Sequence, residues 1–568
     1  MVRARARALS ISSFLGVLFA AQSARATNVT EFPDNGSEQM GRGGAWIARA
    51  SDPLATMFNP AGLAGQHSRI TLQNNFIFEH TCFTRLKSAK DTTFVVAGTD
   101  QDPIVDGTGH YPKVCNDVAL NINPQLGATI RLSDRVGLGL LVIGPSSAGE
   151  KTFPDFIEDG QGQKQAAPNR YLLVKQSGII LFPTLGIGWE VIDDLRIGAS
   201  VSWGFAKVKL ANAAPALNID NGNATNDVRT NLQMADYFVP GFTLGTIYSA
   251  TSNIDVAAWY KWSDAINLKG DLGSAAAYYT KQNANGDDSS VRYGDTYFDD
   301  CGTAVPGDKG KCKQGETGEA KFVIPMEAKL GIRYHQPRSV APAVTPEGGG
   351  PDPAPATPTS SKHVRDPLAQ DAWDLEANLT WTNNSAADTV QIRFPGDASG
   401  QGLVPVSGTG GQLPPNADQP RGYKDVFGIR IGGDYNVLPD RLALRAGSFF
   451  ETGAGGSKYQ NLDFNPQARV GFALGGTYRL RFGEESSSSA LEFSLGYGHV
   501  FFMTREEENR NAQGLPGLSG TSCVNGGEVS GLQSCKDGNV RYRTAWPVNL
   551  GTITNAINVI NVGASYRF

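Results

Sequence analysis

After its first residues, the sequence has no apolar run of the about 20 residues that a membrane-spanning helix needs. The first residues have the pattern of a secretory signal: a basic stretch at 3–7, an apolar run from Ile11 to Ala21 and the cleavage pattern Ala24-Arg25-Ala26. We therefore expect a signal peptide at 1–26, cleaved after Ala26, and export to an oxidising compartment.

The sequence also lacks an excess of basic residues. Lys and Arg number 50 against 55 Asp and Glu, and the formal charge of −5 falls to −9 when the four arginines of the signal peptide are removed. This mild acidity argues against a nucleic-acid partner and against electrostatic anchoring on anionic lipid.

Signatures of catalysis and of metal binding are missing as well. No Gly-x-Ser-x-Gly nucleophile motif occurs. The histidines are dispersed without the spacing of metal ligands: His67, His80, His110, His335, His363 and His499. The sequence favours a protein that is not an enzyme and that has no cofactor or metal site.

What the sequence does have is glycine, 67 of 568 residues, and long alternating runs. In 373–382 and 469–482, for example, apolar side chains alternate with small or polar ones, so that each run has one apolar face. Strands of soluble proteins average about 5–6 residues, whereas a tilted membrane strand has about 9–11. Aromatic residues near the ends of the apolar faces fit an interfacial girdle: Trp373, Trp381, Phe482, Tyr566 and Phe568.

About fourteen such runs predict an all-β fold, an antiparallel transmembrane β-barrel with the even strand number of bacterial single-chain barrels. The runs are 69–83, 117–132, 135–143, 171–191, 195–209, 237–249, 254–265, 322–335, 372–382, 423–437, 441–451, 469–482, 491–503 and 554–568. Tight turns such as 133–134 and 439–440 alternate with long links such as 85–116, 210–236 and 266–321. Short periplasmic turns and long external loops are typical of an outer-membrane barrel.

One link departs from this alternation. The segment 336–367 lies on the short-turn side, yet it contains the Pro-rich run APAVTPEGGGPDPAPATPTS. Such a composition predicts an extended periplasmic insertion without a core of its own. A tolerated insertion and a binding segment for a periplasmic partner or cell-wall polymer both agree with it.

The six cysteines group around three predicted external loops. An even number in an exported chain favours disulfides, and pairing in sequence order keeps each bridge within one loop. We therefore predict the pairs Cys82–Cys115, Cys301–Cys312 and Cys523–Cys535.

The stretch 35–65 comes before the first strand and is rich in turn formers. Its side chains Trp46, Met57 and Phe58 are too apolar for a free tail. We predict that this stretch plugs the barrel, with a hatch at 27–67 and the barrel at 68–568. The three side chains either line a ligand pocket or only pack the plug against the wall.

The segment MGRGGAWIARASDPLATMFNPAGLAG resembles the N-terminal hatch of the FadL/TodX family of outer-membrane transporters for hydrophobic compounds. Its Asn59-Pro60-Ala61 triplet matches that family's NPA hatch motif. NPQLGATIRL, FPTLGIGWEV and LALRAGSFF are similar to family strands, and the final Tyr566-Arg567-Phe568 looks like a barrel-assembly signal. The resemblance implies a plugged, monomeric barrel surrounded by the lipid of the bacterial outer membrane.

The resemblance also implies a route for the ligand. A hydrophobic molecule would be caught among the external loops, pass to a pocket in the barrel and leave sideways as the hatch rearranges. The sideways opening is caused by an inward kink in the third strand, where Gly137, Gly139, Gly144 and Pro145 are places at which the ladder could break. Equally, Gly137 and Gly139 could only make room for the plug.

Two arginines are candidates for holding a fatty-acid carboxylate. Arg430 and Arg445 lie on neighbouring predicted strands, and guanidinium groups bind carboxylates through two hydrogen bonds. The alternative is ion pairing within the barrel, with Asp374, Glu376, Asp434 or Glu492.

Apolar residues in the predicted loop 210–236 are candidates for the external groove. Leu217, Leu232 and Met234 stand out there, because exposed apolar side chains in a polar loop mark binding surfaces.

The function predicted from these features is passive uptake of hydrophobic small molecules, with long-chain fatty acids first and aromatic hydrocarbons second. A water-filled porin for polar solutes, a surface adhesin and an outer-membrane enzyme of lipase type remain as alternatives. A plug that blocks the lumen would contradict the porin.

Overall fold

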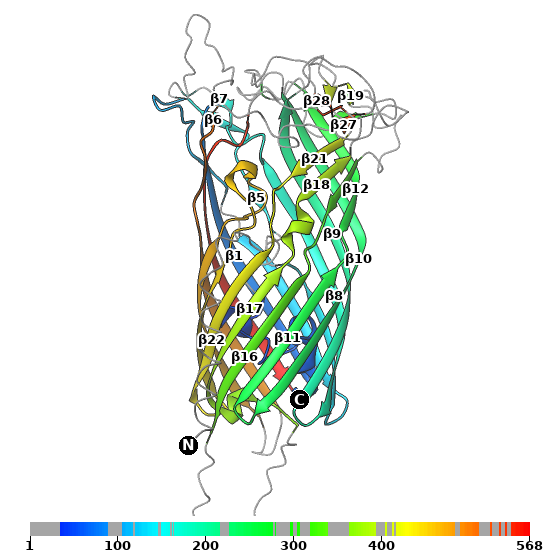
Figure 1. Cartoon of the computed structure of the whole chain (residues 1–568), viewed down its shortest axis with the longest axis vertical. Helices are drawn as coiled ribbons and strands as arrows, with labels where there is room; N and C mark the ends of the chain where they lie inside the picture. Colours follow the sequence, from blue (N-terminus) through cyan, green and yellow to red (C-terminus); the bar gives the residue numbers. More distant parts are fainter. Residues whose placement is uncertain are drawn as a thin grey trace, which may run out of the picture.

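The alternating runs form the wall of a closed antiparallel β-barrel of 14 strands (Figure 1). This architecture was determined from a computed structural model of the chain. The structure describes residues 35–88, 105–117, 120–145, 149–159, 164–215, 227–276, 318–338, 363–393, 416–482, 489–510 and 547–568, with short pieces at 162, 279, 296–298, 304–306, 404–405, 412–413, 523–524, 533–534 and 540–541.

Ten wall strands are continuous and four are built from two consecutive pieces. The continuous strands are β1(Arg69–Arg85), β3(Leu120–Arg131), β4(Val136–Ile143), β8(Lys175–Ile192), β9(Leu195–Pro215), β10(Asp227–Thr251), β23(Leu442–Glu451), β24(Arg469–Arg481), β25(Ala490–Phe502) and β30(Gly551–Arg567). The divided strands are β11(Ile254–Ser263) with β12(Ile266–Ala276), β15(Gly318–Phe322) with β16(Glu327–Pro337), β17(Asp371–Thr382) with β18(Thr389–Arg393), and β21(Asn416–Pro420) with β22(Val426–Leu438). Each strand pairs with its neighbour in sequence, and β1 closes the barrel on β30 with Arg69 opposite Arg567.

Several strands extend further than the sequence pattern predicts. β9 and β10 continue into the predicted loop 210–236, and β12 occupies the start of the predicted loop 266–321. The outward positions just before the β9 extension carry Lys207 and Lys209 instead of apolar residues, and an outward position in β12 carries Lys269. The predictions of a loop at these positions were wrong because the contrast between an apolar and a polar face disappears there, although the ladder continues.

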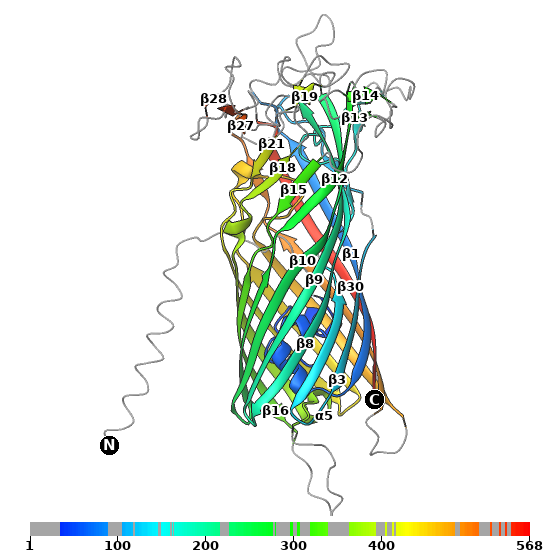
Figure 2. The same ribbon diagram turned by 90° about the vertical axis from the view of Figure 1, so that its right-hand side faces the viewer.

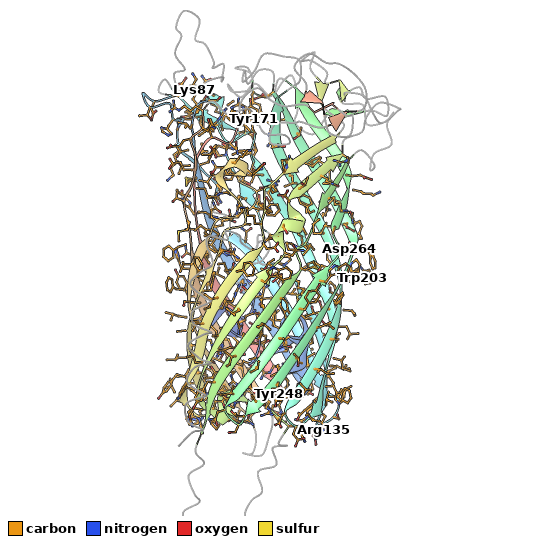
Figure 3. All side chains as sticks on the ribbon, viewed as in Figure 1. Lys87, Arg135, Tyr171, Trp203, Tyr248 and Asp264 are labelled. Atoms are coloured by element: carbon orange, nitrogen blue, oxygen red, sulfur yellow. A yellow bond between two sulfur atoms is a disulfide. The ribbon has the colours of Figure 1, made fainter. Side chains whose placement is uncertain are left out.

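Between these lysines and the end of the barrel with the short turns, the outward face of the wall is apolar. Leu72, Val201, Leu330 and Leu474 point away from the barrel and are about 60% exposed. The apolar band begins near Arg135 and Tyr248 at one rim and ends near Trp203, about halfway up the wall (Figure 3). Contiguous exposed apolar surface of this extent belongs in lipid, and the aromatic edge marks its boundary.

The N-terminal segment lies inside the half of the barrel that the apolar band surrounds (Figure 2). It consists of α2(Ser37–Gly41), α3(Ala55–Phe58) and the 3-10 helix η1(Pro60–Gly65), and residues 35–67 are almost all buried. Residues 35–67 of the predicted hatch therefore lie in the lumen, at the end of the barrel with the short turns.

Other short elements connect the strands. The helices are α5(Pro367–Gln370), η3(Asn384–Ala387) and η4(Ser457–Tyr459), and the loop strands are β2(Val114–Cys115), β5(Lys151–Thr152), β6(Phe156–Glu158), β7(Lys164–Ala166), β13(Thr296–Phe298), β14(Ala304–Pro306), β19(Val404–Pro405), β20(Gln412–Leu413), β26(Arg505–Glu507), β27(Cys523–Val524), β28(Gln533–Ser534) and β29(Val540–Arg541). Within the described ranges, none of the helices has the length and apolar character that crossing a bilayer requires.

The first predicted disulfide is confirmed. Cys82 on β1 and Cys115 on β2 face each other in register and are bonded, with their Cα atoms 4.0 Å apart. The side chains of the other two predicted pairs, Cys301–Cys312 and Cys523–Cys535, lie outside the described residues.

Candidate functional site

The hatch is held together by Asn59 of the Asn59-Pro60-Ala61 triplet. The Asn59 side chain donates to the Ile47 carbonyl at 2.8 Å and accepts from the Ala61 N–H at 3.2 Å, so it joins the two halves of the hatch and begins η1. The wall approaches it closely, because a Cβ on Gly245 of β10 would lie 2.0 Å from the Asn59 Oδ1. Only glycine fits at that position.

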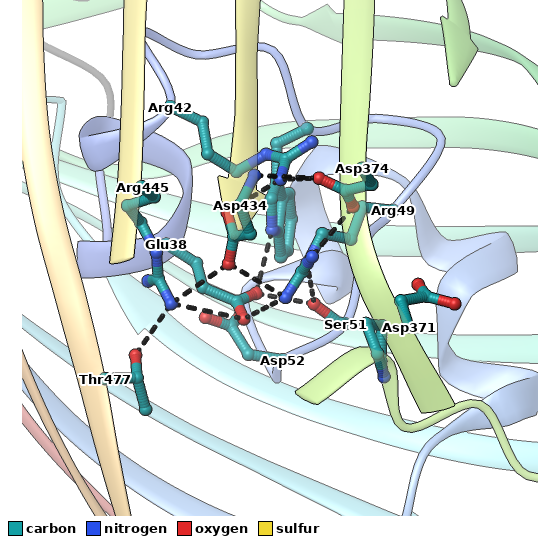
Figure 4. Close-up of polar contacts among 12 residues, drawn as sticks. Glu38, Arg42, Arg49, Ser51, Asp52, Asp371, Asp374, Asp434, Arg445 and Thr477 are labelled. Carbon is teal, nitrogen blue, oxygen red and sulfur yellow. Dashed lines mark hydrogen bonds and ion pairs between the residues drawn. The ribbon is translucent and has the colours of Figure 1, made fainter. Parts of the chain in front are cut away.

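Two buried arginines anchor the hatch to the wall (Figure 4). One Arg42 nitrogen lies 2.6 Å from Asp374 and 2.7 Å from Asp434, on the neighbouring strands β17 and β22. Arg49 contacts the same two carboxylates at 2.8 and 3.1 Å. Buried charges are tolerated when they are paired and hydrogen-bonded, and here each carboxylate binds both arginines.

The wall also accepts hydrogen bonds from the hatch backbone. Glu376 of β17 accepts from the N–H groups of Ala48 at 2.9 Å and Arg49 at 3.2 Å, and Asn378 accepts from Trp46 at 3.1 Å. These side chains give the irregular hatch backbone the partners that a helix or a sheet would otherwise supply.

Two hatch carboxyls close to this network have opposite environments. Burial raises the pKa of Glu38, but the neighbouring Arg49 and Arg445 guanidinium groups outweigh it and bring the pKa well below its usual range. Burial, followed by repulsion from Glu38, raises the pKa of Asp52 from 3.8 to about 7. The Asp52 carboxyl is thus a proton-binding group within the plug.

The second half of the hatch has no ionic anchor. Residues 53–66 contain no charged side chain. Thr56 and Leu63 pack on β4, where a Cβ on Gly139 would lie 2.1 Å from the Thr56 Oγ1 and a Cβ on Gly137 would lie 2.1 Å from the Leu63 carbonyl oxygen. This half is held by close packing and by a few hydrogen bonds, such as the 2.8 Å bond from the Trp259 indole to the Met57 carbonyl.

A cavity of about 160 Å³ lies in the lumen beyond the hatch. That volume is close to the ~150 Å³ of an apolar protein cavity that binds benzene. Most of its walls are apolar side chains from both the strands and the loops, among them Phe182, Leu210, Leu232, Ile266, Leu268, Phe322, Ile324, Val390 and Ile392. Several of these residues belong to one buried apolar cluster with Trp46, Met57 and Phe58 of the hatch, so the apolar interior is continuous from hatch to cavity.

The cavity reaches a break in the wall. The pairing of β4 ends at Ile143, opposite Phe182 of β8. In the part of the segment 144–150 that the structure describes, this edge of β8 has no ladder partner until β5 pairs with Gln176 and Lys175. Pro145 and Gly149 from one side of this interval and Gly178 from the other line the cavity. Within the described residues, the ladder between the lumen and the outside of the barrel is therefore interrupted over this interval.

A cluster of basic residues lies at the hatch side of the cavity. Lys261 lines the cavity and pairs with Glu327 at 3.4 Å. Arg430 contacts Glu451 at 2.5 Å, and Arg469 contacts the same carboxylate.

Lys329 completes this lysine–arginine cluster. Its ammonium lies 4.8 Å from the ring centre of Trp259 and 5.8 Å from that of Phe58. Its positive charge also attracts the nearby Glu451 carboxylate. Lys329 is 4% exposed, and among the described residues it forms no ion pair. Lys329 is thus a buried ammonium group that lies beside the hatch and the cavity lining without an ion pair in the described part of the chain.

The structure separates the two arginines that the sequence suggested as a pair. Arg430 belongs to the cluster beside the cavity, whereas Arg445 lies at the hatch and contacts Asp434 at 3.3 Å and the Thr477 hydroxyl at 2.8 Å. Both arginines make interior ion pairs: Arg445 with Asp434, one of the partners that the alternative interpretation named, and Arg430 with Glu451, which it did not name. A role in ligand binding stays a prediction.

The other predicted residues are placed as follows. Leu232 lines the cavity, and Met234 packs beside it on β10, so both lie on a strand inside the barrel and not in a loop. Leu217 lies outside the described residues. Trp46, Met57 and Phe58 pack between hatch and wall, and the lining found in the described part of the chain does not include them.

The predicted opening is placed at one end of β4 only. Gly137 and Gly139 are paired on both sides, with Arg131 and Thr129 on β3 and with two glycines of β8, so the ladder is intact at these positions. Their lack of a side chain makes room for the hatch. The β4–β8 ladder ends at Ile143, immediately before Gly144 and Pro145, and a sideways opening at that pair stays a prediction.

Sequence reasoning missed Arg42, Arg49, Lys329 and the cavity residues of β12. The available signal was the alternation of Ile266 and Leu268 with polar residues immediately after β11, which continues the period of a strand. The anchoring role of the arginines carried no local signal, because Arg42 and Asp374 are 332 positions apart.

No family model and no curated protein sequence matches the chain. Solved structures do match it. A Pseudomonas aeruginosa FadL homologue is 16% identical, with a TM-score of 0.58 over 95% of this chain and 100% of that one. The Pseudomonas putida toluene transporter TodX is 14% identical, with a TM-score of 0.50 over 94% and 98% of the two chains. The chain therefore has the fold of the FadL and TodX barrels.

Proposed function

We propose that this protein is a passive outer-membrane channel for hydrophobic molecules. The observation that carries the proposal is the apolar lumenal cavity, whose lining extends to the break in the wall between β4 and β8. A hydrophobic molecule in that cavity loses contact with water, which favours its binding by roughly 25 cal/mol per Å² of apolar area buried. The hatch closes the direct route along the barrel axis, so the break beside the cavity is the exit.

Long-chain fatty acids are the first candidate ligands and aromatic hydrocarbons the second. The apolar walls suit both classes, and solved structures of this fold carry the descriptions FadL homologue and toluene transporter. The buried Lys329 ammonium, which forms no ion pair among the described residues, favours a ligand with a carboxylate, whose tail would then extend along Ile266 and Leu268.

Filling the cavity tests the function. In Leu268→Trp the indole occupies the cavity, and we expect loss of ligand binding by the purified protein and loss of uptake by cells that express it. The matched control is Leu244→Trp, an outward position that is 49% exposed, where binding and uptake should be unchanged. Equal uptake by both variants would overturn the cavity as the route.

Replacing Lys329 tests the ligand class. Removal of a charged hydrogen-bond partner costs about 1.5–3 kcal/mol, so Lys329→Gln should weaken fatty-acid binding roughly tenfold or more and leave toluene binding unchanged. Lys269→Gln, on the outside of the barrel and 69% exposed at its side chain, is the control. An equal loss for the acid and the hydrocarbon would show that Lys329 supports the wall and not the carboxylate.

A water-filled porin remains the competing function. The hatch predicts a small, closed-like conductance in planar bilayers, whereas a large and steady ion current would contradict the proposal.

A further inference from the structure

Three side chains of the types that bind metal ions meet at the end of the barrel that carries the short turns. They are Glu190 near the end of β8, Asp193 in the turn to β9, and His363 in the segment that leads to α5. Each offers a ligand atom, and these atoms lie within 4.8 Å of one another. The His363 Nδ1 is 2.9 Å from a Glu190 oxygen.

The second oxygen of Glu190 is an independent sign of a ligand. Glu190 is 1% exposed, and its Oε2 has no hydrogen-bond partner among the described residues. A buried carboxylate oxygen without a partner is costly, and a cation among these three groups would satisfy it.

The cluster joins two parts of the molecule that are far apart in the sequence. The segment with His363 is bound to the hatch, because the Arg365 N–H donates to the Gly65 carbonyl at 2.8 Å. It is also bound to the wall through Asp366, which contacts Arg479 at 2.9 Å. A bond from His363 to β8 would fasten this strap, residues 363–366, across the end of the hatch.

We propose that Glu190, Asp193 and His363 bind one divalent transition-metal ion, with Zn²⁺ as the probe, and that the ion fastens the strap to β8. An imidazole nitrogen with two carboxylate oxygens suits Zn²⁺, whose bonds of about 2.0–2.2 Å place two ligands up to about 4 Å apart. The ligand atoms of Glu190, Asp193 and His363 would have to move only slightly closer together to bind one ion.

Three arginines lie near the cluster, and two of them interact with carboxylates. Arg135 contacts one Asp193 oxygen at 2.5 Å, and Arg196 faces Glu190 across the β8–β9 ladder while also interacting with Asp255. Arg365 follows His363 by two positions. Carboxylates bind a metal ion in their charged form.

The test uses the full chain, purified in detergent, freed of metal with a chelator and dialysed against Zn²⁺. We expect one tightly bound zinc per chain in the wild type and loss of that equivalent in both His363→Ala and Glu190→Gln. Gln keeps the size of Glu190 and its hydrogen bond to His363, so loss in that variant reports on the missing charge. The migration of unheated protein on gels confirms that each barrel is folded.

His335→Ala is the matched control. His335 also lies beside carboxylates at the same end of the barrel, with Asp371 3.0 Å from its Nδ1 and Asp255 3.8 Å from its Nε2. The two carboxylates face different ring nitrogens, and among the described residues these three side chains do not bring their ligand atoms close enough together to hold one ion. If all variants bind zinc equally, or if the wild type binds no stoichiometric zinc, the result means an adventitious ion only. Either result overturns the proposal.

Hydrogen exchange tests the strap itself. Zinc should slow amide exchange at 364–366 in the wild type and have no effect in Glu190→Gln. Unchanged exchange in the wild type would overturn the fastening role. The outcome is independent of which molecule the channel transports, because none of the three ligands lines the cavity.

Discussion

At the scale of single residues, one wall carboxylate carries much of the hatch attachment. Asp374 contacts Arg42 and Arg49 of the hatch and Arg333 of β16, and it is buried with all three. Removing one partner of a buried ion pair costs about 3–5 kcal/mol, because the remaining charges stay desolvated. The loss of Asp374 therefore acts on the hatch more than on the barrel, whose ladder bonds are untouched.

We predict that Asp374→Asn loosens the hatch without unfolding the wall. Hydrogen exchange at residues 42–49 should become faster, and the ion conductance of the reconstituted protein should rise. The control is Asp440→Asn at a periplasmic turn, where the carboxylate pairs with Arg479 and Arg481 but is partly exposed, so its loss should cost at most about 1 kcal/mol. Equal effects of the two substitutions would contradict the anchoring role of Asp374.

The raised pKa of Asp52 predicts a pH dependence of the hatch. Because its pKa is about 7 in the folded hatch and 3.8 in the unfolded chain, the folded state binds a proton that the unfolded state releases between these values. The contribution of this group to stability is therefore complete below about pH 3.8 and is lost as the pH rises through 7. Asp52→Asn fixes the neutral form and should remove this dependence.

Infrared difference spectra between the wild type and Asp52→Asn provide the measurement. A protonated-carboxyl band should be present at about pH 6 and absent at about pH 8. The Leu54 N–H bond to the side chain, 2.8 Å in the wild type, is retained by Asn and keeps the two proteins comparable. A band that is already absent at pH 5 would contradict the predicted pKa.

At the scale of elements, the sequence predicted the strands where lipid imposes a uniform pattern. In the lower part of β9, outward residues such as Val201 and Trp203 are apolar and inward ones are polar, because the two faces meet lipid and the hatch. Beyond Trp203 the outward residues are Lys207 and Lys209, and the inward ones line an apolar cavity. The pattern inverts while the ladder continues, which is why Leu232 was assigned to a loop.

The same inversion places the membrane boundary on β9. We predict that a spin label at Val201→Cys contacts lipid acyl chains and that one at Lys209→Cys contacts water, as measured by collision with an apolar and a polar relaxation agent. Acyl-chain contact at both positions would place the boundary higher. Since Ile179 of β8 pairs with Lys207, the predicted boundary puts the break in the wall level with the outer surface of the lipid.

At the scale of the whole molecule, the hatch has two halves with different attachments. The first half carries the ion pairs, and α2 packs on β23, β24, β25 and β30. The second half, with α3 and η1, has no charge and packs on β4, β8, β9 and β10, the side of the barrel that contains the break. We infer that α2 stays docked during release and that the uncharged half moves.

Two cysteine tethers distinguish movement of one half from movement of the whole hatch. Thr56→Cys with Gly186→Cys joins the uncharged half to β8, where a Cβ on Gly186 would lie 3.0 Å from the Thr56 Cγ2. Gly41→Cys with Gly475→Cys joins α2 to β24, where a Cβ on Gly41 would lie 3.3 Å from the Gly475 Cα. Both distances are compatible with the Cβ separation of about 3.8 Å in a disulfide.

We predict that the oxidised Thr56→Cys/Gly186→Cys tether abolishes uptake, that a reductant restores it, and that the oxidised Gly41→Cys/Gly475→Cys tether leaves uptake unchanged. Ligand binding by the purified protein should persist in both, because neither tether enters the cavity. A block by both tethers would mean that the hatch moves as one body. Uptake through both would make the hatch a fixed stopper and would leave the break between β4 and β8 to open without it.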